Sequence, residues 1–202
     1  MSENGRQTTK TKRTTVTRAP QRASYDIQLL QEIIKESIIG HLSFNHDNSV
    51  HSIPMPFWCI GEYLYCHCSV GSRLSKLVDS HQDSCISFAI IDALVLAKSA
   101  FRHSFNYRSV VIYGQFELVI DNQEKMKAMK KFMELFDKER WGEARIPNKK
   151  ELNATAILKL PLKEAVTKMR KGPPNDKKAD LDREVWTGII PKLYSYGKPE
   201  PS

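Results

Sequence analysis

The feature that most constrains this fold is a series of short β-type segments between residues 38 and 120. These segments are rich in aromatic and β-branched residues, and they include IGHLSF, HSIPMPFWCI and EYLYCHC. The turn-forming sequences HDNS and GE separate them. Short strands joined by tight turns form an antiparallel meander. The strands do not alternate with helices, which argues against a doubly wound α/β sheet.

The remaining segments add further strands and three helices. CISFAII and ALVLA are predicted as two strands with Asp92 near the turn between them, and YRSVVIYGQFELVID as one long strand. ATAILKLPL and EAVTKMRK are predicted as the last two strands. Helices are expected after Ser24 as the N-cap, over SRLSKLVDS, and over NQEKMKAMKKFMELFDK with Asn122 as the cap. The fold class is therefore mainly β, a barrel with helical additions.

The charge is concentrated at the N-terminus. Residues 1–22 carry six basic residues against Glu3, a net of +5, so the rest of the chain carries +3 of the total +8. This Thr-rich, apolar-poor stretch is predicted to be a disordered basic tail. It can contact polyanions non-specifically, but no motif indicates specific nucleic-acid binding, and the stretch lacks the amphipathic face of a transit peptide.

The domain organisation follows from this distribution. Residues 23–192 are predicted to form one domain that includes a C-terminal docking segment with EVWTGIIP, and residues 193–202 a C-terminal tail. No apolar run approaches the length of a membrane span. The four cysteines do not indicate a secreted disulfide scaffold, which predicts reduced thiols in a cytoplasmic protein.

The sequence HCSVGSRLSKL, residues 67–77, joins a predicted strand to a predicted helix. Gly71 permits a close backbone approach, and Ser72 supplies a hydroxyl. Arg73 offers a bidentate fork and Lys76 a point charge, which together suit a phosphate group. An ordinary serine N-cap with exposed basic residues is the alternative at this point.

Several motifs occur together in one order: GSR-x-x-K, then NYRSV-x-x-G, then W-x-G-x-x-P near the end. In this order the sequence resembles the FMN-binding split-barrel proteins related to pyridoxamine 5′-phosphate oxidase, and in particular the nitroimidazole-reductase-like branch. The resemblance covers roughly residues 24 to 191. It implies a six-stranded split β-barrel and a homodimer with two FMN sites at the interface. It also implies a flavin-dependent oxidoreductase acting on a small molecule, with NAD(P)H as a possible electron donor.

The resemblance also implies which residues bind the cofactor. One strand would follow the edge of the isoalloxazine ring through its backbone, at Ser52, Ile53, Pro54 and Met55. A second group would lie beside the ribityl chain and hold the phosphate: Tyr65, Cys66, His67, Ser72, Arg73 and Lys76. Ser109 would lie near the flavin, and Trp186 of the partner chain would cover the ring or the phosphate side. No catalytic acid or base is indicated.

Three alternatives to a flavin reductase remain open. The protein could carry or sense FMN without turnover, because the flavin rather than the side chains performs the redox chemistry. It could instead bind haem in the same architecture, with any of six histidines as ligand: His41, His46, His51, His67, His81 and His103. A metal site at Cys66-His67-Cys68 is disfavoured, because a strand directs the two thiols one way and His67 the other. The second phosphate-binding constellation that a vitamin B6 oxidase needs is absent from the C-terminal sequence VWTGIIPKLY.

Overall fold

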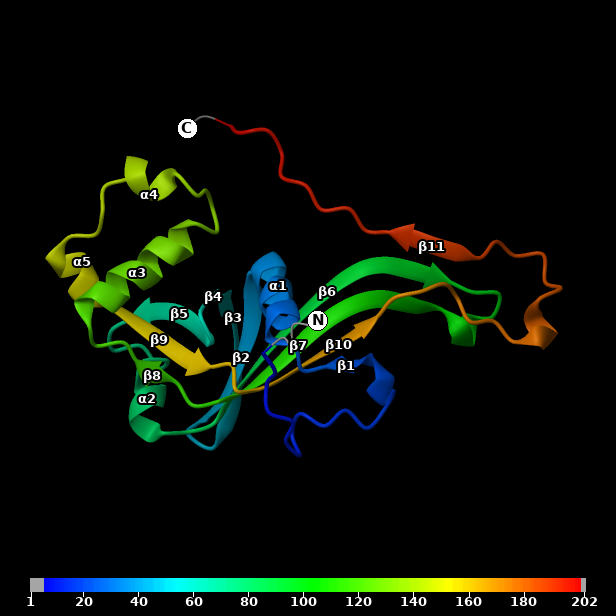
Figure 1. Cartoon of the computed structure of the whole chain (residues 1–202), viewed down its shortest axis with the longest axis horizontal. Helices are drawn as coiled ribbons and strands as arrows, with labels where there is room; N and C mark the ends of the chain where they lie inside the picture. The colour runs from blue at the N-terminus through cyan, green and yellow to red at the C-terminus, as the bar shows by residue number, and fades with distance from the viewer. Residues whose placement is uncertain (1–5, 201–202) are drawn as a thin grey trace, which may run out of the picture. The chain divides into compact units, whose positions relative to one another are not determined.

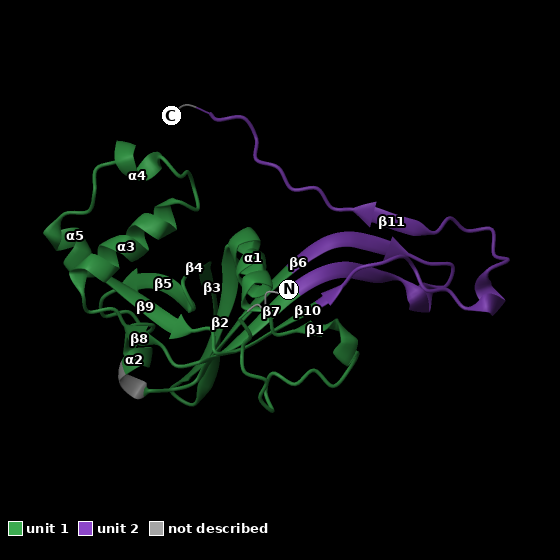
Figure 2. Cartoon of the chain, viewed as in Figure 1, with its two compact units in different colours: residues 1–89, 109–168 green, residues 90–108, 169–202 purple. Residues whose placement is uncertain are grey.

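The computed structural model of this chain describes residues 6–200, apart from the side chains of residues 79 and 80. It contains two compact units, shown in separate colours in Figure 2: residues 1–89 with 109–168, and residues 90–108 with 169–202. The sequence predicted one domain over residues 23–192 and did not anticipate this division. The long strands β6 (Ser84–Leu96) and β7 (Ser104–Gly114) run from the first unit into the second.

The chain is mainly β with a few helices, as predicted, and its strands form two antiparallel sheets (Figure 1). Within the described residues, one sheet has the order β1-β10-β7-β6-β2-β3, with β11 paired to β6, and the other has the order β4-β5-β9-β8. The other strands are β1 (Ala23–Ser24), β2 (Ile39–His46), β3 (Ser49–Pro56), β4 (Trp58–Ile60), β5 (Tyr63–Ser69), β8 (Glu117–Leu118), β9 (Thr155–Pro161), β10 (Glu164–Arg170) and β11 (Gly188–Pro191). The α-helices are α1 (Ile27–Ser37), α2 (Lys76–Ser80), α3 (Asn122–Met133), α4 (Arg140–Glu143) and α5 (Lys149–Ala154), and short 3-10 turns span Pro20–Arg22, Ala100–Arg102 and Lys178–Asp180.

The hairpin of β2 and β3 follows directly from the sequence HDNS. Asp47 and Asn48 both have positive φ, 50° and 58°, as a tight two-residue hairpin turn requires. Gly40, Leu42 and Phe44 alternate with exposed or half-buried positions along β2 and point into the core. This hairpin places β3 at the edge of its sheet.

The boundaries of α1, α3 and β6 differ from the sequence predictions. The N-cap of α1 is Asp26, whose carboxylate accepts two N–H groups of the first turn, while the Ser24 hydroxyl accepts from the Asp26 N–H instead. The N-cap of α3 is Asp121 and not Asn122, since a carboxylate one residue earlier accepts the amide of Glu124. CISFAII and ALVLA form the single strand β6, with Asp92 inside it rather than at a turn.

Residues 6–22, which the sequence predicted as part of a disordered tail, pack against other parts of the chain in the structure, and residues 1–5 lie outside the described residues. Thr14 is fully buried, and the hydroxyl of buried Thr8 donates to the carbonyl of Ala165. The Arg13 guanidinium bonds both oxygens of Glu164, at 3.1 and 2.5 Å, and one oxygen of Asp83 at 2.5 Å. Arg13, one of the basic residues that made this segment look disordered, therefore attaches it to acidic residues far away in the sequence.

Replacing Arg13 by Ala is expected to lower the free energy of unfolding by about 1 kcal/mol, because two partly exposed ion pairs are lost. Hydrogen bonding to Arg13 holds the pKa of Glu164 below its ordinary value. The stabilisation is therefore present above the ordinary carboxyl pKa and is lost as the pH falls through the lowered one. Urea unfolding at neutral and at acidic pH measures both effects. Arg18→Ala, an exposed cation of the same segment, is the matched control, and an equal loss in both variants would contradict the prediction.

The second unit contains the far ends of β6 and β7, strand β11 and the C-terminal residues. Arg108 bonds the Asp92 carboxylate through Nε and Nη2, at distances between 2.6 and 3.1 Å, so Arg108 is a salt-bridge partner within the unit. Strand β11 pairs with β6 in the register Ile189 to Val95. Among the described residues, no helix is both long and apolar enough to span a bilayer.

Candidate functional site

The loop that leaves β5, residues 69–76, is called here the cationic loop. Gly71 adopts a φ of +86°, a conformation that favours glycine, and this turns the chain out of the strand. Helix α2 begins only at Lys76, so Ser72 and Arg73 lie in the preceding turn and not in a first helical turn as predicted. Serine side chains bind the N–H groups here: Gly71 N–H donates to Ser75 Oγ at 3.2 Å, and Ser75 N–H donates to Ser72 Oγ at 3.3 Å. Anion binding at this loop therefore depends mainly on its cationic side chains.

Arg73 and Lys76 are exposed on the cationic loop, and neither forms an ion pair with a carboxylate in the part of the chain that the structure describes. The Arg73 Nη1 lies 3.3 Å from Nδ1 of His51, which projects from β3. The His51 ring stacks on Phe44 with the ring centroids 5.6 Å apart. Strand β3 and the cationic loop thus meet at a positively charged surface, and no carboxylate among the described side chains pairs with Arg73 or Lys76, which suits a phosphate.

The residues predicted to follow the ring edge lie on β3. Ser52 and Pro54 are exposed, Ile53 is half-buried and Met55 is buried, as alternation along a strand requires. Because β3 is an edge strand, its outer backbone groups have no strand partner within residues 6–200. These groups are free to bind the polar edge of a flat ligand.

Strand β5 directs its predicted site residues to two opposite faces. Cys66 is fully buried on one face, and this burial raises the pKa of its thiol. Tyr65 and His67 lie on the other face. Burial first, and then the hydrogen bond that the Tyr65 hydroxyl donates to Glu124 at 2.9 Å, raise the pKa of Tyr65. The three residues therefore do not form one cluster, and only His67 faces an open space.

Ser109 and Trp186 have structural contacts of their own. The Ser109 hydroxyl donates to the carbonyl of Lys168 at 3.0 Å, a bond between β7 and β10. Trp186 belongs to the second unit, is 62% exposed and packs its ring over Gly188, where a Cβ would lie 2.7 Å from the indole. Their predicted contacts with a flavin stay predictions.

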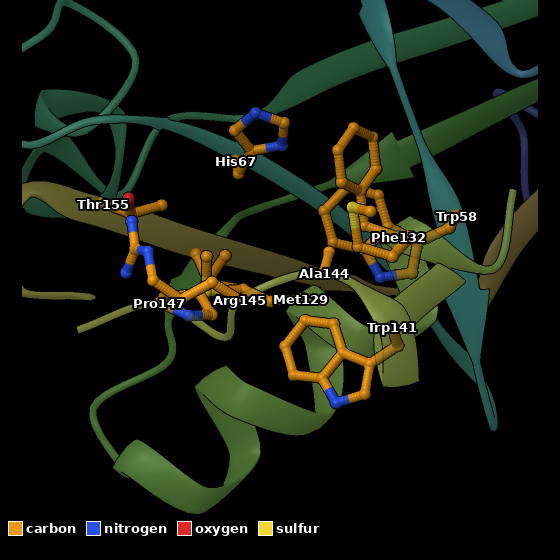
Figure 3. A pocket seen from close by; sticks show the side chains of 11 residues that line it. Trp58, His67, Met129, Phe132, Trp141, Ala144, Arg145, Pro147 and Thr155 are labelled. Atoms are coloured by element: carbon orange, nitrogen blue, oxygen red, sulfur yellow. The ribbon is translucent and has the colours of Figure 1, made fainter. Parts of the chain in front are cut away.

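A cavity of about 260 Å³ lies between the second sheet and helices α3 and α4 (Figure 3). Trp58, His67 and Ile157 line it from the sheet, and Met129 and Phe132 from α3. Its remaining lining residues are Met133, Trp141, Ala144, Arg145, Pro147 and Thr155. The walls are therefore mostly apolar and aromatic, as in sites for flat organic molecules.

His67 is the main ionisable group on the sheet side of this cavity. Its ring meets Phe132 edge to face with the centroids 4.7 Å apart, and Trp58 lies 5.9 Å away. Burial lowers the pKa of His67, so the imidazole is neutral at pH 7. No hydrogen bond to either ring nitrogen occurs within residues 6–200. The same residues contain no group of three or more potential metal-ligating side chains.

Sequence reasoning missed two parts of these sites. From the sequence, His51 was only one of six histidines. Its contact with Arg73 could not be predicted, because the two residues are 22 positions apart in the chain. The cavity was missed entirely, because its aromatic side chains come from β4, α3 and α4. The methionines at helical spacing along α3 were the available signal, since two of them, Met129 and Met133, line the cavity.

Comparison with known proteins identifies the chain. The family model for pyridoxamine 5′-phosphate oxidase matches residues 26–169. This protein belongs to the pyridoxamine 5′-phosphate oxidase family. The split-barrel fold class predicted from the sequence is thereby confirmed, whereas the count of six barrel strands stays a prediction. Members of the family bind flavin nucleotides.

Three solved structures resemble this family member. The flavocytochrome Anf3 from Azotobacter vinelandii is 33% identical, with a TM-score of 0.89, and the match covers 95% of this chain and 89% of that one. The FAD- and haem-binding protein from Mycobacterium smegmatis is 26% identical, with a TM-score of 0.84 and coverage of 90% and 89%. A candidate 5-nitroimidazole antibiotic resistance protein from Bacteroides thetaiotaomicron is 18% identical, with a TM-score of 0.61 and coverage of 72% and 85%, and shows the fold alone. No curated protein matches the sequence.

Proposed function

We propose that this protein is a flavin-dependent oxidoreductase acting on a small molecule, with the flavin phosphate bound at the cationic loop. The observation that carries the proposal is a pair of exposed cations, Arg73 and Lys76, beside His51 in a flavin-binding family. Neither cation has an acidic partner among the side chains that the structure describes. FMN and FAD both present phosphate to such a loop, so both are candidate cofactors. The ring would lie along the edge strand β3, at Ser52 and Pro54.

When bound, a flavin supplies the hydride or electron transfer, and the protein supplies position and electrostatics. Arg73 and Lys76 hold the negative charge, and the unpaired backbone edge of β3 orients the ring. The described side chains near this site present no acid–base pair, which fits a role confined to binding and orientation.

A homodimer is also proposed, because the second unit exposes much apolar surface. Exposed apolar side chains that gather into a patch mark interaction sites. The exposed large apolar side chains of that unit are Ile91, Leu94, Phe101, Phe105, Leu181, Val185, Trp186, Ile189, Ile190, Leu193, Tyr194 and Tyr196. Light scattering after size exclusion measures the mass, and a monomer at micromolar concentration would contradict a stable dimer.

A haem-containing oxidoreductase, that is, a flavocytochrome, is the second candidate. Two similar structures that cover 90% or more of this chain are described as a flavocytochrome and as an FAD- and haem-binding protein. In this chain, a neutral histidine facing an apolar cavity supports the same combination.

Titration with FMN, FAD and riboflavin tests the main proposal. We expect the protein to bind FMN or FAD and to change the flavin absorbance and fluorescence, and to bind riboflavin more weakly because it lacks phosphate. Equal affinity for riboflavin and FMN would contradict phosphate recognition. No binding of any flavin would overturn the proposed function.

Turnover of the bound flavin distinguishes an oxidoreductase from a flavin carrier. We expect NADPH or NADH to reduce the bound flavin under anaerobic conditions, and a nitroaromatic compound or a quinone to reoxidise it. A flavin that binds but is neither reduced nor reoxidised indicates a carrier. The absorbance of the oxidised flavin follows both steps.

A further inference from the structure

We propose that the cavity around His67 binds a non-covalent haem, with the His67 imidazole as an axial ligand of the iron. This inference rests on the flavocytochrome candidate above and assigns it to named residues. The sequence has no C-x-x-C-H motif for covalent attachment. Haem supplies electron-transfer or oxygen chemistry, and the protein supplies the axial ligand, the pocket and its polarity.

The choice of His67 follows from the surroundings of the six histidines. An axial ligand needs a neutral imidazole with a free ring nitrogen in an apolar space. His41 and His81 are exposed. Three others have polar partners for a ring nitrogen: His46 with Asp47, His51 with Arg73, and His103 with the Ser99 carbonyl. Of the six histidines, His67 alone lines this cavity, and no hydrogen bond to its ring occurs among the described residues.

The cavity walls suit a flat apolar macrocycle. Trp58, His67, Phe132 and Trp141 all line this cavity (Figure 3). Flat rings pack against aromatic faces and methionine side chains, and Met129 adds a thioether to the same wall. Trp58 belongs to a buried hydrophobic cluster, and Met129 and Phe132 pack against that cluster.

A cation lies at the same cavity. Arg145 lines it, and its Nη1 and Nη2 donate to Glu151 at 3.0 and 2.6 Å, which fixes the orientation of the guanidinium. A guanidinium has five N–H donors. Arg145 donates two hydrogen bonds to the Glu151 carboxylate and one to the Ile146 carbonyl. The remaining donors can bind a carboxylate, the group that haem carries on its propionate side chains.

The cavity, at about 260 Å³, is smaller than a whole haem, so residues 137–148 are expected to move outward on binding. These residues, called here the lid segment, include α4 and are almost all exposed, with only Trp141, Ala144 and Pro147 partly buried. A segment with so few buried apolar contacts opens at a low cost in free energy. Bound haem would then give the lid segment the apolar contacts that it lacks, and would order it.

Reconstitution of the purified protein with hemin tests the inference by spectroscopy. We expect the wild-type protein to give a Soret band of a histidine-ligated haem. His67→Ala is expected to lose this band and to regain it when free imidazole is added, because imidazole can occupy the space of the missing ring. His41→Ala, an exposed histidine on β2, is the matched control and is expected to keep the band. The flavin absorbance and far-UV circular dichroism of each variant show that it is folded.

Limited proteolysis gives an independent readout of the site. Trypsin can cleave the lid segment after Lys138, Arg140 and Arg145, and haem bound in the cavity is expected to slow this cleavage in the wild type but not in His67→Ala. A wild-type protein that takes up flavin but no haem would overturn the flavocytochrome candidate together with this site. A Soret band that is identical in wild type and His67→Ala would overturn the assignment of His67 while leaving haem binding intact.

Discussion

Arg73→Ala is expected to raise the dissociation constant for FMN about 10- to 100-fold. A charge-assisted hydrogen bond to a phosphate contributes about 1.5 to 3 kcal/mol, and about 1.4 kcal/mol corresponds to a factor of ten in affinity. Arg73 is exposed and has no acidic partner within the described residues, so the substitution leaves the free energy of unfolding almost unchanged. Fluorescence titration with FMN measures the affinity, and urea unfolding measures the stability.

Riboflavin distinguishes a phosphate contact from a general loss of binding. The Arg73→Ala variant is expected to bind riboflavin as the wild type does, so that the preference for FMN over riboflavin shrinks toward one. Arg18→Ala removes one positive charge elsewhere and controls for net charge. If Arg73→Ala weakened riboflavin and FMN equally, Arg73 would support the ring and not the phosphate.

The sequence predicted the cationic loop because its residues are adjacent in the chain. A turn and its positive charge can be predicted, without tertiary information, from glycine, serine, arginine and lysine within six positions. The same reasoning placed the helix too early, because it could not show that the Ser72 and Ser75 hydroxyls accept N–H groups of the turn. A local pattern therefore predicted which side chains are present but not which donors remain free.

Features that depend on distant partners could not be predicted in this way. The composition of residues 1–22 indicated disorder, yet Arg13 pairs with Glu164, 151 positions away. The cavity around His67 likewise needs Trp58 from β4 and Trp141 from α4 in one place. Neither side chain carries a local signal of this role, since a lone tryptophan is more often a core residue.

Gly40→Ala is expected to destabilise the barrel by about 1 to 3 kcal/mol, the usual effect of overpacking a core. A Cβ at residue 40 would lie 2.5 Å from the ring of Phe88 and 3.0 Å from that of Phe57. Both rings are buried and meet edge to face at 5.6 Å, so neither can move aside without disturbing the other. Urea unfolding measures the change. A lower melting temperature is expected as well, by about 2–4 °C for each kcal/mol.

Gly142→Ala is the matched control, because a Cβ at that position of α4 meets no atom within 4 Å. This control is expected to be neutral or slightly stabilising, since alanine favours a helix over glycine. Adding Phe88→Leu to Gly40→Ala is expected to restore part of the lost stability, because a smaller side chain makes room for the methyl group. Additive effects of the two substitutions would show that the methyl group and the Phe88 ring do not compete for the same space. The cost of Gly40→Ala would then have to arise at the Phe57 ring.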